Sequence, residues 1–119
     1  MQIDWSSFHS TYSESEVKKY VPKDAGVYLL WVKLKNDKWR CFYAGQAKDL
    51  EARLLAHLSD SEENECLKTN VSKYVCGFEY AKVSLQKERD GIEKYLYDHY
   101  TPKCNDIDPG GTAIPVNLP

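Results

Sequence analysis

A short polar connection between two apolar, β-rich segments constrains the fold of this chain more than any other feature. Residues 27–32 read Val-Tyr-Leu-Leu-Trp-Val, and residues 39–44 read Trp-Arg-Cys-Phe-Tyr-Ala. The continuous apolar run at 27–32 is typical of a strand that is covered on both faces. Because the polar connection at 33–38 is short, the two segments are expected to form an antiparallel hairpin. That pairing brings the strand ends that carry Tyr28 and Tyr43 close together.

Helical patterns lie on both sides of this hairpin. Ser13 and Glu16 have the spacing of a capping box, which predicts a short helix that ends before Pro22. A second helix is predicted to begin at Asp49, because leucines then recur every four residues along one face. A longer helix is predicted over 84–100, with its first residue, a serine, as the cap.

The remaining segments complete an α+β fold. A third strand is predicted between residues 71 and 83, and the acidic stretch 59–64 is predicted to be a loop. At 119 residues the chain is long enough for one core, so a single domain with a β-β-α-β-α core and an N-terminal helix is expected. Its expected parts are a helical lead-in, a core and an extended tail, over residues 1–23, 24–105 and 106–119.

The charge and hydropathy of the chain limit its functions. A net charge of −2 and a pI of about 5.9 argue against a broad, sequence-independent coat for nucleic acid, although a small basic cleft remains compatible. No apolar run reaches the length of a membrane span, and the first residues lack the basic and apolar parts of a secretory signal. A cytoplasmic location without membrane partners is therefore expected.

The cysteines give no sign of a metal or disulfide scaffold. They stand at positions 41, 66, 76 and 104, without a C-x-x-C pair. This spacing fits neither a zinc knuckle nor a disulfide framework. Since disulfides are rare in the cytosol, we expect free thiols.

Two tripeptides in the hairpin belong to a longer ordered set of polar residues. Gly26-Val27-Tyr28 and Tyr43-Ala44-Gly45 are followed by Arg53 and His57 on the predicted helix, and later by Glu93. This set resembles the GIY-YIG nuclease superfamily, in particular its UvrC-like branch, which acts in DNA excision repair. The resemblance spans residues 24–105 and implies a small three-stranded antiparallel sheet flanked by helices, which agrees with the fold expected from the pattern.

The resemblance also implies catalytic roles. Glu93 matches the ligand of a single divalent ion, Mg²⁺ or Mn²⁺, and Arg53 matches the arginine that neutralises the scissile phosphate. Tyr43 matches a general base or water-positioning group, and Tyr28 matches a residue that helps to hold the site and the water. His57 matches a histidine that acts as base or phosphate ligand.

Four further residues are implied on the substrate side of the site: Gly45, Gln46, Lys48 and Asn105. Gln46 departs from the family pattern, which commonly has a lysine there, and this leaves Lys48 as the nearest cation. Asn105 matches a late asparagine that orients other groups.

A single carboxylate is compatible with a magnesium site, because Mg²⁺ keeps several waters and also binds phosphate oxygens of the substrate. The identity of the base is left open. A phenol with a pKa near 10 is a poor base at neutral pH, so Tyr43 needs nearby positive charge. The alternative is that His57 takes the proton, which its pKa suits better.

Each site residue also has a purely structural interpretation. Arg53 can pair with Asp49 on the helix surface, and His57 can be an exposed helix histidine. Glu93 can pair with Arg89 one turn earlier or with Tyr97 one turn later. The occurrence of all these groups together, in the family order, favours function over structure.

The primary hypothesis is a metal-dependent endonuclease that hydrolyses DNA phosphodiester bonds, targeted by a partner protein or a separate DNA-binding subunit. An alternative is a domain of the same shape that binds nucleic acid or protein without cutting. A third possibility is a protein-interaction domain that uses exposed aromatic side chains of the lead-in, such as Trp5, Phe8 and Tyr12.

Overall fold

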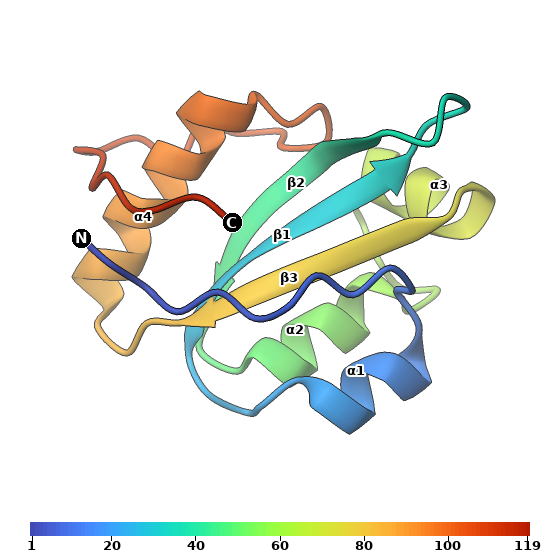
Figure 1. Cartoon of the computed structure of the whole chain (residues 1–119), viewed down its shortest axis with the longest axis horizontal. Helices are drawn as coiled ribbons and strands as arrows, with labels where there is room; N and C mark the ends of the chain where they lie inside the picture. The colour runs from blue at the N-terminus through green and yellow to red at the C-terminus, as the bar shows by residue number, and fades with distance from the viewer.

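A three-stranded antiparallel sheet forms the centre of the computed structural model, which describes residues 1–119 (Figure 1). Its strands lie in the spatial order β2-β1-β3, so the first strand of the hairpin is the central one. The elements in chain order are α1 (Glu14–Tyr20), β1 (Gly26–Lys33), β2 (Trp39–Ala47), α2 (Leu50–His57), α3 (Glu65–Lys73), β3 (Cys76–Lys82) and α4 (Gln86–Tyr100). This arrangement confirms the predicted α+β fold.

A β-bulge in β2 determines which way its aromatic side chains point. Leu30 pairs with Tyr43 and Trp31 pairs with Cys41, so Phe42 is an extra residue in the ladder. Phe42 is a buried member of the core on the α2 face of the sheet, and Tyr43 packs against the same core while staying partly exposed. The bulge therefore lets two successive residues serve one face.

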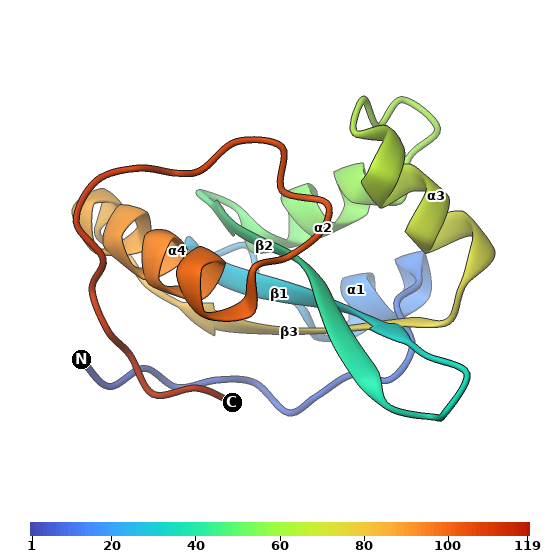
Figure 2. The ribbon, with the colours of Figure 1, turned by 90° about the horizontal axis from the view of Figure 1, so that it is seen from above.

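The two faces of the sheet carry separate cores. Leu50 and Leu54 of α2, with Val17 of α1, pack against one face, and α3 adds Leu67. Ile92 and Leu96 of α4 pack against the opposite face, together with residues of both chain ends. Figure 2 shows α4 on one side of the sheet and helices α1 to α3 on the other. None of the helices combines the length and apolarity needed to cross a membrane.

Irregular segments cover both edges of the sheet. The N-terminal chain runs beside β3 (Figure 1), where the backbone N–H groups of His9 and Phe78 donate to each other's carbonyl oxygens at 2.9 Å. At the edge of β2, the Asn105 amide accepts from Ala44 N at 3.0 Å and donates to Ala44 O at 2.9 Å. Asn105 thus imitates a residue of a neighbouring strand.

Helix α3 was missed by the sequence analysis, which expected only a loop and then a strand in this region. The side chain of Asn64 caps the helix by accepting from Leu67 N at 3.0 Å. Leu67 is the one buried residue of α3. A helix with a single buried position has almost no apolar periodicity, so its sequence gives a weak signal.

The predicted cap of the long helix was wrong. Leu85, not Ser84, is the N-cap residue of α4, and no side chain caps it. Instead, the buried guanidinium of Arg89 donates from Nη1 to Ser84 O at 2.8 Å and to Val83 O at 3.0 Å. These bonds fix the turn between β3 and α4.

The expectation of four free thiols was also wrong for one pair. Cys66 and Cys104 form a disulfide, whereas Cys41 and Cys76 are free and buried. The bond joins the first turn of α3 to the segment that follows α4. Because α3 itself was not predicted, nothing in the spacing indicated that these two cysteines meet.

Candidate active site

The two motif tyrosines lie side by side, as the hairpin predicted. Their ring centroids are 6.1 Å apart with an angle of 25° between the planes. Gly45 pairs with Tyr28 across the ladder and is buried under the rings. A Cβ atom at Gly45 would lie 2.5 Å from the Tyr28 hydroxyl and 2.9 Å from Cε1 of Tyr43. The second motif therefore needs glycine so that both phenols can pack together.

The glycine of the first motif also has a packing reason. A Cβ atom at Gly26 would lie 2.2 Å from the carbonyl oxygen of Ala81 and 2.8 Å from Cδ1 of Leu50. At Gly26 there is thus no room for a side chain between β1, β3 and the first turn of α2, the helix that carries Arg53 and His57.

Tyr28 and His57 form a buried polar pair beneath the site. Tyr28 is 0% exposed and His57 is 3% exposed, and the Tyr28 hydroxyl lies 2.7 Å from His57 Nε2. His57 Nδ1 lies 3.1 Å from Oε1 of Glu62, in the loop after α2. The interpretation of His57 as an exposed helix histidine is therefore wrong, and its ring instead connects a phenol to a carboxylate.

Burial dominates the pKa shifts of these groups. It raises the pKa of Tyr28 well above its ordinary value. It also raises the pKa of Tyr43, more than the neighbouring Arg53 guanidinium lowers it. Burial lowers the pKa of His57 although Glu62 acts in the opposite direction, so His57 is neutral at pH 7. In the folded protein both phenols therefore keep their protons at neutral pH.

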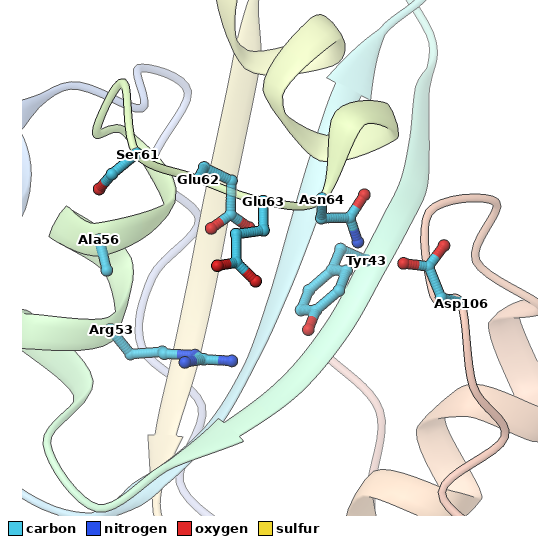
Figure 3. A pocket seen from close by; sticks show the side chains of 8 residues that line it. All are labelled: Tyr43, Arg53, Ala56, Ser61, Glu62, Glu63, Asn64 and Asp106. Atoms are coloured by element: carbon cyan, nitrogen blue, oxygen red, sulfur yellow. The ribbon is translucent and has the colours of Figure 1, made fainter.

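Tyr43 borders two adjoining cavities. The first, of about 570 Å³, is also lined by Arg53, and Figure 3 shows Arg53 and Tyr43 entering it from different elements. The second, of about 340 Å³, is lined by Tyr43 together with Glu93 and Asn105. Asn64 and Asp106 line both cavities. The phenol of Tyr43 thus lies between a cation on one side and a carboxylate on the other.

Glu93 is half-buried on α4 and makes few bonds within the protein. Its Oε1 accepts from Nε2 of Gln46 at 3.3 Å, and burial raises the pKa of its carboxyl group. It does not pair with Arg89, whose guanidinium bonds to backbone carbonyls. No group of three or more His, Cys, Asp or Glu side chains surrounds a common metal position. This donor set does not fit zinc, but one carboxylate with open lone pairs fits Mg²⁺.

Comparisons with individual known proteins point to the same kind of domain as the sequence motifs. No model of a protein family matches the chain. The chain is 29% identical over 90 residues to the UvrABC system protein C of Bdellovibrio bacteriovorus, an alignment that covers 76% of this chain. It spans only 14% of that relative's length.

The structural similarity is to one domain of such a protein. A point mutant of the GIY-YIG N-terminal endonuclease domain of UvrC from Thermotoga maritima, bound to its catalytic divalent cation, matches with a TM-score of 0.56 and 26% identity, covering 77% of this chain and 97% of that one. The magnesium-bound structure of that domain matches with a TM-score of 0.55 and 26% identity, covering 76% and 96%. This chain is therefore similar in fold and sequence to the GIY-YIG N-terminal endonuclease domain of UvrC.

The predicted substrate-side residues do not gather in one place. Gln46 and Lys48 line a third cavity of about 530 Å³, which Arg53 also borders. Asn105 is held by Ala44 at the edge of β2, and Gly45 is buried. Asp49 does not pair with Arg53, because its side chain caps α2 by accepting from Ala52 N at 3.0 Å.

Gln46, the departure from the family pattern, is the centre of a polar network. Its Nε2 donates to Asp90 at 2.7 Å as well as to Glu93, and its Oε1 accepts from Gln86 at 2.8 Å. A carboxamide can donate and accept at once, which an ammonium group cannot do. Gln46 therefore has a structural role at a position where the sequence indicated only a lost cation.

Sequence analysis missed several polar residues that line the cavities, among them Glu62, Asn64 and Asp106. Their positions depend on α3 and on the disulfide, neither of which was predicted. The only signal available for Glu62 was an acidic loop that follows the helix carrying His57.

Proposed function

We propose that this GIY-YIG domain is a metal-dependent endonuclease that hydrolyses phosphodiester bonds in DNA. The position of Tyr43 carries the proposal, because its phenol borders both the cavity of Arg53 and the cavity of Glu93. Phosphodiester hydrolysis needs a cation beside the phosphoryl oxygens, an activated water and a stabilised leaving group. A phenol between a guanidinium and a metal-binding carboxylate matches that requirement.

Glu93 would hold the divalent ion, Mg²⁺ or Mn²⁺, and the similar UvrC domains are described as bound to a catalytic divalent cation. When bound, such an ion stabilises charge on phosphoryl oxygens and makes a coordinated water more acidic. The bond from Gln46 holds the Glu93 carboxylate in place without neutralising it. The remaining lone pairs of Glu93 stay available.

The other residues would bind the phosphate and manage the proton. Arg53 can donate two parallel hydrogen bonds to non-bridging oxygens of the scissile phosphate. Tyr43 keeps its proton at neutral pH, so we assign it to orienting the attacking water through its hydroxyl group. His57 is buried and its Nε2 faces the Tyr28 hydroxyl group, so we assign this pair to supporting the site from beneath.

The test is nicking of supercoiled plasmid and cleavage of branched DNA in the presence of Mg²⁺. We expect activity from the wild-type domain and loss of activity from a Glu93→Ala protein that unfolds at the same temperature. Equal cleavage by the two proteins would show that the activity comes from a contaminant, and the proposal would fail.

One observation favours the alternative of a binding module that does not cut. Glu62, Glu63 and Asp106 line the cavity of Arg53, and their negative charge opposes the approach of a phosphate. Tight, metal-independent DNA binding without cleavage would favour this alternative. A low-salt binding measurement beside the nicking assay separates the two functions.

Targeting by a partner protein or by a separate DNA-binding subunit follows from the same charge argument, because a net charge of −2 gives weak general affinity for DNA. A role in DNA repair rests on the relative, of which this chain spans only a small part. The cytoplasmic location stays a prediction, and the Cys66–Cys104 disulfide is of a kind that persists mainly in oxidising compartments.

A further inference from the structure

Positive charge is concentrated in the connection between β1 and β2. Residues 33–40 contain one acid, Asp37, and four cations: Lys33, Lys35, Lys38 and Arg40. This stretch has a formal charge of +3, and since the whole chain has a net charge of −2, the other residues together carry −5. One ion pair lies within it, from Lys33 Nζ to Asp37 Oδ1 at 3.7 Å. The other three cations are exposed and form no ion pair within the domain.

The connection has a fixed shape and projects from the domain. Leu34 N donates to the carbonyl oxygen of Lys38 at 2.8 Å, and Asp37 N donates back to the carbonyl oxygen of Leu34 at 3.0 Å. In Figures 1 and 2 the hairpin extends beyond the rest of the molecule at one end of the sheet. None of its cations lines the three cavities of the candidate site. The hairpin is therefore a second, accessible group of positive charges apart from Arg53.

An aromatic pair lies beside these cations. The ring centroids of Phe8 and Trp39 are 4.9 Å apart, with an angle of 69° between the planes. A Cβ atom at Gly77 would lie 2.6 Å from Cζ of Phe8, so the Phe8 ring rests directly on the backbone of β3. Phe8 is nevertheless 39% exposed. Val75, whose carbonyl oxygen accepts from Lys33 N at 2.9 Å, is 59% exposed.

Phe8 differs from the other aromatic side chains of the lead-in. Trp5 Nε1 donates to the carbonyl oxygen of Asn117 at 2.8 Å, and the Tyr12 hydroxyl group donates to the carbonyl oxygen of Leu54. Both rings are partly buried. Phe8 is thus the lead-in aromatic side chain whose ring stays open to solvent next to the hairpin.

We propose that this surface binds an unpaired segment of a nucleic-acid strand. We define the hairpin surface as Phe8, Trp39 and Val75 with the four cations of residues 33–40. Lysine and arginine side chains neutralise backbone phosphates, and exposed aromatic rings stack on bases whose faces are free. Bases in a duplex already stack on one another, so an unpaired strand fits an aromatic surface better. The proposal rests on the proposed function, because it gives the domain a second contact with the DNA that it cuts.

The charges around the candidate site favour a nucleic acid over an acidic protein as the partner. Glu62, Glu63 and Asp106 line the cavity of Arg53 and oppose the approach of phosphates. A DNA substrate therefore needs attraction from another part of the domain, and the hairpin surface supplies it. Trp39 and Tyr43 lie four residues apart on β2, which is about 13 Å along a strand. One nucleic-acid strand can thus contact both the hairpin surface and the site.

A purely structural interpretation is that the lysines oppose aggregation at the end of the sheet and that Phe8 covers β3. Such a role affects solubility and unfolding, but not the affinity for DNA or its dependence on salt. The double variant Lys35→Gln/Lys38→Gln removes two charges from the hairpin. Lys19→Gln/Lys23→Gln is the matched control, because it removes two charges from exposed lysines in and after α1. Phe8→Leu keeps an apolar contact with β3 and removes the aromatic ring.

The test is fluorescence anisotropy with a labelled single-stranded thymidine oligonucleotide, in EDTA so that no cleavage occurs. We expect the hairpin double variant to bind about tenfold or more weakly at about 50 mM salt, and its slope of log K against log salt to fall by about 1.4, because each phosphate contact on a single strand contributes about 0.7. Phe8→Leu should bind about fivefold or more weakly with an unchanged slope, because a stacked base is lost. The control should change affinity by less than about threefold. Equal losses in the two double variants would show a general charge effect and overturn the proposal.

Two further measurements identify the ligand and the place where it binds. A duplex of the same length that binds as tightly as the single strand would overturn the assignment to unpaired bases. Binding to vesicles of anionic lipid, without binding to the oligonucleotide, would assign the surface to a membrane instead. Backbone NMR shifts on addition of the oligonucleotide should concentrate at residues 33–40 and near Phe8, and shifts confined to the surroundings of Arg53 would overturn the proposal.

These binding measurements use no metal, so they do not depend on cleavage. Equal cleavage by the wild-type and Glu93→Ala proteins would remove the nuclease function and leave the anisotropy and NMR results unchanged. Loss of activity in Glu93→Ala, together with unchanged oligonucleotide binding by the hairpin double variant, would overturn the hairpin surface alone. Failure of this proposal is thereby distinguished from failure of the proposed function.

Discussion

The two sides of Tyr43 differ in how completely folding has satisfied their polar groups. On the α2 side, Tyr28 and His57 are buried and bonded in series to Glu62. On the α4 side, Glu93 is half exposed and receives one long bond from Gln46. A buried polar group needs hydrogen-bond partners within the protein, whereas a half-exposed carboxylate can be hydrated by water until a ligand binds. The α2 side is therefore organised in advance, and the α4 side is left open for a ligand.

The largest effect should come from the open side. Glu93→Gln should lower kcat/KM by about a thousandfold or more, since a bound metal ion supplies several kcal/mol of transition-state stabilisation. Its unfolding temperature should stay close to that of the wild type. Asp90→Asn is the matched control one turn earlier on α4, with an expected change below about fivefold. Equal losses in both variants would show a general charge effect instead of a metal ligand.

The disulfide links the two sides, because it joins α3, next to the Glu62 loop, to the segment that carries Asn105. Replacing Cys66 and Cys104 together by alanine should lower the free energy of unfolding by roughly 2–4 kcal/mol, the usual stabilisation by a disulfide. Urea denaturation measures this change. Dithiothreitol should bring the wild type to the same stability and leave the variant unaffected, and a wild type that ignores the reductant would contradict the prediction.

The two motif tyrosines should differ in their contribution to stability. Tyr28→Phe leaves the buried Nε2 of His57 without a partner, which costs about 1–3 kcal/mol of unfolding free energy. Tyr43→Phe removes a partly exposed hydroxyl group and should change stability by less than about 0.5 kcal/mol. Chemical denaturation of both proteins in one buffer compares them directly. Similar losses would mean that Tyr43 belongs to the buried network.

The buried His57 on the α2 side should also make the free energy of unfolding depend on pH. Burial lowers the pKa of His57 in the folded protein, so the unfolded chain binds more protons just below the ordinary histidine pKa of about 6.5. The contribution of His57 to stability is therefore complete above that pH and is lost as the pH falls, by at most about 1.4 kcal/mol per pH unit. Denaturation of the wild type and of His57→Gln between pH 7.5 and about 5 isolates this contribution. Parallel pH curves for the two proteins would refute it.

The smallest effect is expected at Gln46. Gln46→Lys places an ammonium group near Asp90 and Glu93, where a surface ion pair is worth about 1 kcal/mol or less. Cleavage should therefore change by less than about fivefold in either direction. A larger gain would show that the wild-type glutamine limits the activity of the domain.

The parts of the molecule that depend on local pattern were predictable from the sequence. The hairpin follows from two β-rich runs with a short polar connection, and it correctly brought Tyr28 and Tyr43 together. The helix that carries Arg53 and His57 followed from its leucine spacing. The bulge at Phe42 was not predictable, since it depends on which aromatic side chain the core accepts.

The rest of the site depends on contacts between distant segments. Glu62 meets His57 through the loop before α3, and Asp106 reaches the same cavity through the segment held by Cys104. Neither position has a periodic or spacing signal, because an acidic surface loop and an acidic binding loop have the same composition. Burial of His57 could not be predicted from the sequence either, since its position on the helix allows either exposure to solvent or contact with the sheet.

The covering of both sheet edges has a consequence for association. An exposed strand edge is a template to which another chain can add a strand, and this is a common route to aggregation. Here the N-terminal segment occupies the edge of β3, and the Asn105 side chain blocks the edge of β2 at Ala44. A partner that binds at these positions must therefore contact side chains, because the backbone N–H and C=O groups there already have hydrogen-bond partners.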